Sequence, residues 1–124
     1  MRPEILYLTD IVEAVDAIGR FLHDVEREAF LNDELRQSAV LQKLIVIGEA
    51  ASRISPETRA QHSEVKWRSA IGLRNIGVHE YFSLNWDIVW VTATQDVALL
   101  REQIAAILAE VTKDQDQGGA DMPT

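Results

Sequence analysis

The sequence predicts an all-α protein, an antiparallel bundle of four main helices plus one short helix. Apolar residues recur at three- and four-residue steps along most of the chain, and no stretch sustains the alternation typical of a strand. The length of 124 residues fits one compact domain. We therefore expect a single helical domain over residues 1–112. Residues 113–124 have few apolar side chains and two adjacent glycines, so we expect a disordered tail there.

The first half of the chain predicts two long helices. The first covers residues 5–30, with acidic side chains opposite its apolar face and Pro3 at its start. Asn32 and Asp33 are plausible caps for the second, whose apolar positions continue to Ile54. Inside it, the small residues of the run Gly48-Glu49-Ala50-Ala51 would permit another helix to cross closely.

The second half predicts one short helix and two longer ones. In Ser55-Pro56-Glu57 a cap, a first helical position and an acid follow one another, so a short helix should begin there and end near His62. A further helix is expected over residues 65–82, where Gly72 and Gly77 weaken it or allow another backbone to approach. Asn85 should cap the last helix.

Composition excludes several classes of protein. There is no cysteine, so disulfides, thiolate zinc sites and cysteine nucleophiles are ruled out. The N-terminal apolar run contains acids, which does not fit a signal peptide, and no apolar stretch is long enough to span a bilayer. We expect a cytoplasmic protein with no membrane association.

Charge is distributed unevenly. The net charge of −8 argues against a general nucleic-acid binder. Residues 50–80 nevertheless carry five basic and three acidic side chains, whereas residues 1–49 carry five and ten, and residues 81–124 carry two and seven. On charge alone, this locally positive segment is as consistent with chance as with an anion-binding surface.

The segment with chemical potential holds Arg74, Asn75, His79 and Tyr81. On a regular helix Asn75 and His79 share one stripe and Arg74 and Tyr81 nearly align, but Arg74 and His79 are about 140° apart. Arg74 must then bend its long side chain toward His79, unless the helix frays at Gly77.

These residue types suit RNA cleavage without a metal. Histidine can exchange a proton near neutral pH, arginine offers a fork of donors to phosphate, and asparagine can orient the imidazole or donate to phosphate. RNA supplies its own nucleophile, the 2′-hydroxyl, so we expect no metal site and no cofactor. An arginine and a histidine five residues apart also occur often by chance, and a tyrosine such as Tyr81 is more often a packed core aromatic than a functional residue.

The pattern Arg74-Asn75-x-x-x-His79-x-Tyr81 resembles the signature of the HEPN superfamily, specifically its HepT-like toxin branch. The resemblance covers about residues 4–110. It includes five further motifs: Tyr7-Leu8-x-Asp10-Ile11, Ile47-Gly48-Glu49-Ala50-Ala51, Ile54-Ser55-Pro56-Glu57, Trp67-Arg68 and Ile88-Val89-Trp90. Where the family often has aspartate before the tyrosine, this chain has Glu80, which keeps the charge.

The resemblance implies a metal-independent endoribonuclease that acts as a homodimer on RNA. Arg74, Asn75 and His79 would be the catalytic residues, in a cleft at the dimer interface. It also implies a toxin whose antitoxin is a minimal nucleotidyltransferase that silences it by transferring AMP from ATP to Tyr81. Two alternatives remain: a non-catalytic nucleotide-binding HEPN subunit of a nucleotidyltransferase, and a helical dimerisation module. The intact set of four residues favours the enzyme.

Overall fold

The protein is described here by a computed structural model that covers residues 2–76 and 84–120, with side chains as far as Asp114. Every regular element in these ranges is a helix, so the all-α prediction is confirmed. Their order along the chain is α1 (Glu4–Phe21), α2 (Arg27–Leu31), α3 (Glu34–Ser52), α4 (Pro56–Gln61), α5 (Trp67–Gly72), η1 (Leu73–Asn75), α6 (Trp86–Val91), η3 (Thr92–Asp96) and α7 (Val97–Ala120).

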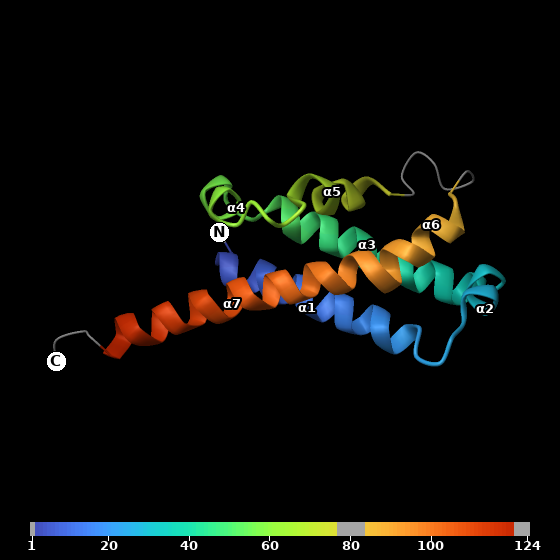
Figure 1. Ribbon diagram of the computed structural model, residues 1–124, viewed down its shortest axis with the longest axis horizontal. Coiled ribbons are helices and arrows are strands. Elements are labelled where there is room, and N and C mark those ends of the chain that lie inside the picture. The colour runs from blue at the N-terminus through green and yellow to red at the C-terminus, as the bar shows by residue number, and fades with distance from the viewer. Residues whose placement is uncertain (1, 77–83, 121–124) are drawn as a thin grey trace.

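Three long rods form the body of the bundle. Helix α1 packs against α3 and against α7, and it runs antiparallel to both (Figure 1). The elements α6, η3 and α7 follow one another without a break and form one rod. On the other side of α3 lie α5 and η1, which run antiparallel to it (Figure 1). Helix α3 therefore carries the segment with the candidate site.

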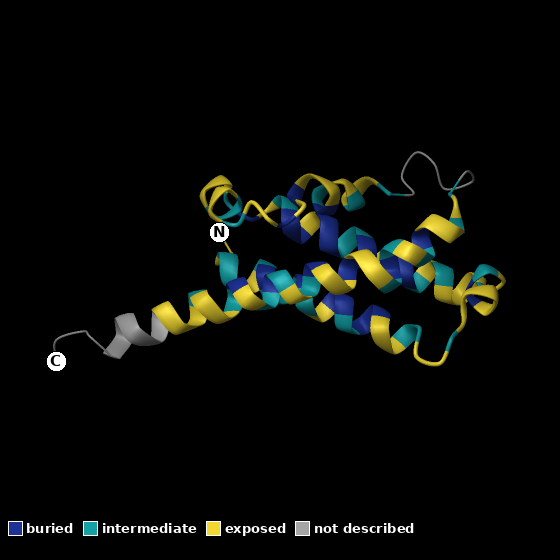
Figure 2. Cartoon of the chain, viewed as in Figure 1, coloured by how far each residue is buried: buried dark blue, intermediate teal, exposed yellow. Residues whose placement is uncertain are grey.

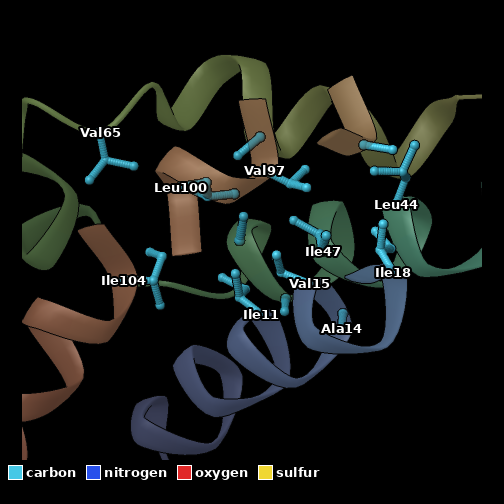
Figure 3. Packing of buried hydrophobic residues seen from close by; sticks show 14 of the residues in the cluster. Ile11, Ala14, Val15, Ile18, Leu44, Ile47, Val65, Val97, Leu100 and Ile104 are labelled. Atoms are coloured by element: carbon cyan, nitrogen blue, oxygen red, sulfur yellow. The ribbon is translucent and has the colours of Figure 1, made fainter. Parts of the chain in front are cut away.

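The core fills the space between the rods. Burial alternates with exposure along each helix, so the buried faces of α1, α3 and α7 turn toward one another (Figure 2). Aliphatic side chains from all three interdigitate at the centre (Figure 3). Those with no measurable exposure include Leu8, Ile11, Val40, Leu44, Ile47 and Ile104, and Phe30 of α2 is as fully buried. Burying each such side chain stabilises the fold by roughly 1.5–3 kcal/mol before the loss of conformational entropy.

All three predicted N-caps form. The side chain of Asp33 accepts a hydrogen bond from the amide of Arg36, and the hydroxyl of Ser55 accepts one from the amide of Thr58. The Asn85 side chain accepts from two amides in the first turn of α6. Helix α4 ends at His62 as predicted. Local side-chain chemistry therefore determines where three of the helices begin.

The predicted first helix, over residues 5–30, is wrong beyond Phe21. The chain turns there, and Asp24 adopts a left-handed conformation with φ of 57°. Aspartate tolerates this conformation better than most residues. Residues Arg27–Leu31 then form the separate short helix α2, which buries Phe30. The apolar spacing continued through the break because Val25 and Phe30 contact the same core from a different direction.

The last rod contains a wider π-helical turn, η3, which periodicity did not predict. Across this turn the buried residues follow at two successive steps of four, from Val89 of α6 through Ala93 of η3 to Val97 of α7, before steps of three and four alternate along α7. The hydroxyl of Thr94 donates to the carbonyl of Trp90 at 2.7 Å, which satisfies an acceptor in the irregular turn.

Helix α7 continues to Ala120, past residue 112 where we expected the domain to end (Figure 1). The domain boundary and the disorder of the tail stay predictions. In the described ranges no helix combines the length and apolarity needed to cross a membrane.

Candidate active site

Arg74 and Asn75 lie on the 3₁₀ turn η1, which continues α5 directly. The helical turn ends at Asn75 and Ile76 is extended, with ψ of 128°, so the predicted helix over residues 65–82 is interrupted at Ile76; residues 77–82 lie outside the described residues. The amide of Ile76 closes the turn on the carbonyl of Leu73 at 3.1 Å. Both Arg74 and Asn75 are exposed. The tightened turn thus presents a guanidinium and a carboxamide, side by side in sequence, to solvent.

The other two predicted site residues, His79 and Tyr81, lie outside the described residues. The structure therefore brings together only Arg74 and Asn75 of the four. The geometry between these two residues and the imidazole or the phenol stays a prediction.

Gly48 of α3 fixes the position of this turn. A Cβ atom on Gly48 would lie 2.7 Å from the Cα of Arg74 and 2.7 Å from the carbonyl carbon of Leu73, and closer still to the amide of Arg74. Real Cβ atoms do not approach backbone this closely. The small-residue run predicted to permit a close crossing therefore does so, and the backbone that it admits is that of Arg74.

Of the two alternatives left open for Gly72, a weaker helix or the close approach of another backbone, the close approach does not occur. A Cβ atom built on Gly72 would meet nothing within 4 Å. Glycine is required in α3, beneath the turn, and is not required by packing in α5 itself.

Apolar contacts anchor both ends of the chain around the site. Ile76 at one end and Leu84 at the other are partly buried and pack against the core. Beyond Leu84, Trp86 lies edge-on to Phe30 with ring centroids 6.1 Å apart. The beginning of α6 is thereby held against α2.

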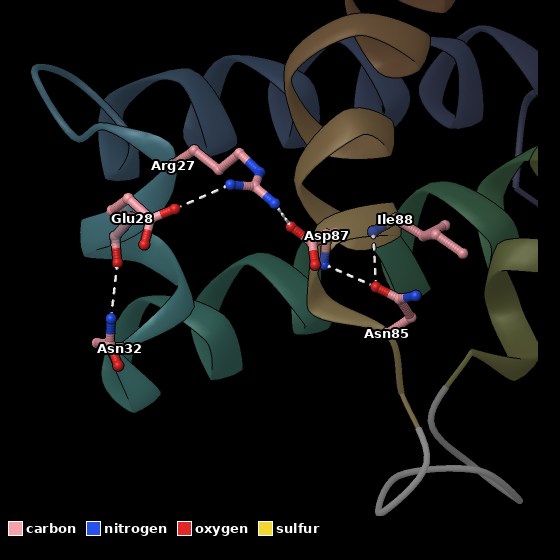
Figure 4. A network of polar contacts seen from close by, with 6 residues as sticks. All are labelled: Arg27, Glu28, Asn32, Asn85, Asp87 and Ile88. Carbon is pink, nitrogen blue, oxygen red and sulfur yellow. Dashed lines mark hydrogen bonds and ion pairs between the residues drawn. The ribbon is translucent and has the colours of Figure 1, made fainter.

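A polar network reinforces the same region (Figure 4). The Asn85 side-chain oxygen accepts from the amides of Asp87 at 3.0 Å and Ile88 at 3.3 Å. The Asp87 carboxylate pairs with Arg27 of α2, which also donates to Glu28. These contacts tie the first turn of α6 to α2, so the two described ends that flank His79 and Tyr81 are both fixed to the bundle.

The charges near the site differ from those elsewhere. Outside residues 50–80, four of seven basic side chains pair with carboxylates in the described ranges: Arg2 with Asp10, Arg27 with Asp87, Arg36 with Asp33 and Arg101 with Asp16. Inside that segment none of the five does so among the described residues; they are Arg53, Arg59, Lys66, Arg68 and Arg74. Intramolecular pairing in the described structure thus leaves this cationic surface uncompensated.

Two hollows flank α5. One, of about 280 Å³, lies between α5 and the rod of η3 and α7, and it reaches Leu73 directly beside Arg74. The other lies between α4 and α5 and is lined by the guanidinium-bearing residues Arg59 and Arg68. Arg59 is a candidate site residue that residue type and spacing did not reveal. The sequence shows it only as one of the basic residues of segment 50–80, because the packing of α4 beside α5 is a tertiary contact.

Comparisons with known proteins agree with this architecture. The family described as HepT-like, "Ribonuclease HepT-like", matches residues 11–107. A protein of Thermococcus cleftensis named "Probable ribonuclease HepT" is 35% identical over 95 residues, which cover 77% of this chain and 86% of that protein. No solved structure matches significantly.

Two other relatives carry names of the same kind. A Methanocaldococcus jannaschii protein named "Putative RNase" is 30% identical over 101 residues, covering 82% of this chain and 93% of its own. A Caldanaerobacter subterraneus protein, also named "Putative RNase", is 31% identical over 102 residues, with 82% and 91% covered. The family match spans α3, the Gly48 contact and the exposed turn of Arg74 and Asn75. This chain therefore belongs to the HepT-like ribonuclease family and is a ribonuclease.

Proposed function

We propose that this ribonuclease is a metal-independent endoribonuclease that cleaves RNA through attack of its own 2′-hydroxyl. The observation that carries the proposal is the turn of Arg74 and Asn75, which is exposed, fixed on Gly48 and free of ion pairs among the described residues. An arginine in that setting is available to a substrate phosphate, because it does not have to break an internal pair first.

In the proposed reaction, His79 takes the proton of the 2′-hydroxyl as general base. The 2′-oxygen forms a bond to the neighbouring phosphorus, and the bond from phosphorus to the 5′-oxygen breaks. The departing 5′-oxygen receives a proton from water or from the imidazolium of His79, and the 3′ end of the cut strand becomes a 2′,3′-cyclic phosphate. Arg74 stabilises the charge on the phosphate oxygens with its paired donors, and Asn75 orients the imidazole or donates to phosphate.

Incubation of the purified protein with total RNA in excess chelator tests this mechanism. We expect fragments ending in 2′,3′-cyclic phosphate, identified by mass spectrometry. His79→Ala should abolish cleavage without loss of helical circular dichroism. Arg74→Lys should lose most activity because a point charge cannot reproduce the bidentate fork. Unchanged cleavage by His79→Ala would remove that residue from the mechanism. Nucleotide binding without any RNA cleavage would instead support a non-catalytic subunit.

We further propose that the active form is a symmetric homodimer with the Arg74 turns facing one cleft. The chain is acidic overall, so one copy offers a weak field to phosphate, and a two-fold axis would bring two cationic segments together. Light scattering at micromolar concentration should give twice the mass of 14.0 kDa. Full activity in a monomeric sample would contradict the assembly.

The proposed biological role is that of a cytoplasmic toxin, silenced by a nucleotidyltransferase antitoxin that adenylylates Tyr81. The support is the family membership and the position of the tyrosine two residues after His79. The added phosphate would be attracted to Arg74 and occupy the place of substrate. Tyr81→Phe keeps the ring and deletes the acceptor oxygen, so it should remain toxic and unlabelled when partner and ATP are supplied. Normal AMP labelling of this variant would refute the assignment.

A further inference from the structure

The groove between α4 and α5 has the chemistry of a nucleotide-binding surface. This α4–α5 groove is open and shallow, with a volume of about 490 Å³, and it is lined by Pro56, Arg59, Ala60, Trp67, Arg68 and Ile71. Four of these residues give it an apolar floor, and two arginines add positive charge. An apolar surface beside guanidinium groups suits a ligand with a flat, weakly polar face and an anionic group, which describes a nucleotide.

Neither arginine is neutralised within the described structure. Arg68 is exposed, and neither it nor Arg59 lies within ion-pair distance of a described carboxylate. The Nε atom of Arg59 is buried and has no hydrogen-bond partner in the part of the chain that the structure describes. A buried donor without a partner is unfavourable. Arg59 as a whole is half-buried and lines the groove, so an anion there would lie against a side chain that has no acceptor among the described residues.

The groove leads to the candidate active site. Ile71 lines its floor, and Arg74 lies three residues further along the same helix. Residues i and i+3 lie nearly above one another where a helix tightens to 3₁₀ geometry, so Arg74 follows Ile71 on the same side. Arg68 lies six residues before Arg74, a rise of about 9–10 Å along α5 and η1. A strand whose phosphate contacts Arg74 can therefore continue toward Arg68.

We propose that the α4–α5 groove binds single-stranded RNA next to the phosphate held at Arg74. Arg59 and Arg68 contact its phosphates, and the apolar floor receives a base or ribose. Single-stranded RNA fits because the bases of a duplex are stacked and unavailable to such a floor. The inference rests on the proposed function, since it takes RNA as the substrate, and it adds two residues outside the catalytic set.

Binding of an oligonucleotide that cannot be cleaved tests the groove separately from the chemistry. The probe is a fluorescein-labelled 2′-O-methyl oligoribonucleotide of mixed sequence, about twelve nucleotides long, followed by anisotropy over a range of salt concentrations. Methylation removes the attacking hydroxyl. The test variant carries Arg59→Gln and Arg68→Gln. The matched control carries Arg20→Gln and Lys113→Gln, which remove the same charge from exposed positions outside both the groove and the basic segment of residues 50–80.

We expect the groove variant to bind at least about tenfold more weakly. The slope of log K against log salt should become shallower by about 1.4, which corresponds to two lost phosphate contacts on a single strand. The control should change little in either quantity. If the double variant melts at a much lower temperature, the single variant Arg68→Gln takes its place in the binding measurement. Its salt slope should become shallower by about 0.7.

Three results would contradict the proposal that the groove binds RNA. Equal weakening in the test and control variants would show a general charge effect. Wild-type binding and cleavage in the groove variant would exclude the groove while leaving the ribonuclease mechanism intact. Loss of binding to the nucleotidyltransferase partner, with RNA binding unchanged, would assign the groove to a protein. If instead the wild-type protein neither binds nor cleaves RNA, the proposed function itself fails.

Discussion

Replacing Gly48 with alanine tests whether contact with α3 positions the site. The new Cβ atom would lie 2.7 Å from the Cα of Arg74, whereas ordinary contact begins at 3.4 Å. The turn must therefore retreat by at least about 0.7 Å, and the closer amide demands more. Displacements near 1 Å can lower a catalytic rate by about a hundredfold. We expect Gly48→Ala to lose most cleavage activity through displacement of Arg74.

Two opposing effects set the stability of Gly48→Ala. Overpacking costs about 1–3 kcal/mol, and alanine in the middle of α3 returns about 0.5–1 kcal/mol of helix propensity. The net expectation is a loss of about 0–2.5 kcal/mol, measured by urea denaturation. Gly72→Ala and Gly19→Ala are matched controls, because both glycines are helical and neither Cβ would meet an atom within 4 Å.

The controls should be as stable as the wild type or about 0.5–1 kcal/mol more stable. Gly72→Ala is the sharper control because it lies two residues from Arg74 and should retain cleavage. If Gly48→Ala matched Gly72→Ala in both stability and rate, the close approach of Arg74 to α3 would not constrain the site.

Three further results are expected. Burial raises the pKa of Glu4, but hydrogen bonds from Ser55 and Thr58 outweigh it and leave that pKa below 4.5. The stabilisation that ionised Glu4 provides is therefore complete above about pH 4.5 and is lost as pH falls through the lowered pKa. Glu4→Gln should lower the free energy of unfolding by about 1–2 kcal/mol at pH 7. It should also reduce the fall in melting temperature on the acid side of the pH profile. Asn85→Ala removes the cap of α6 and should cost about 0.5–2 kcal/mol in urea, whereas Asn85→Gly should cost only a few tenths. Arg101→Gln breaks the pair between α7 and α1 and should lower the melting temperature slightly at low salt, with no difference at high salt.

Local chemistry determined what the sequence could predict about the fold. Each cap at Asp33, Ser55 and Asn85 depends on a side chain and amides within three residues, so the pattern is visible in the sequence. The break after Phe21 was not predicted because apolar spacing continued through it. The π turn was not predicted either, since one added residue changes the period too little to recognise.

The candidate site also has features that the sequence could predict and features that depend on tertiary contacts. Arg74 and Asn75 were predicted as site residues from their types together with the family resemblance; the structure shows that both are exposed, and their catalytic role stays a prediction. The contact beneath Arg74 is tertiary, so the sequence could indicate that Gly48 admits a close neighbour but not which one. Arg59 was missed for a similar reason, because its relevance depends on α4 lying beside α5.

The separation of charges explains how an acidic chain can act on RNA. A net charge of −8 repels phosphate at long range, but at physiological salt this repulsion is screened beyond about 8 Å. Contacts within that distance then decide binding. In the described ranges, four basic side chains outside residues 50–80 form ion pairs with carboxylates, and none between Arg53 and Arg74 does so. Under the proposed function, an RNA strand that reaches this surface would meet uncompensated cations, whereas the acidic remainder of the described chain would disfavour contact, so we expect binding at α4, α5 and η1.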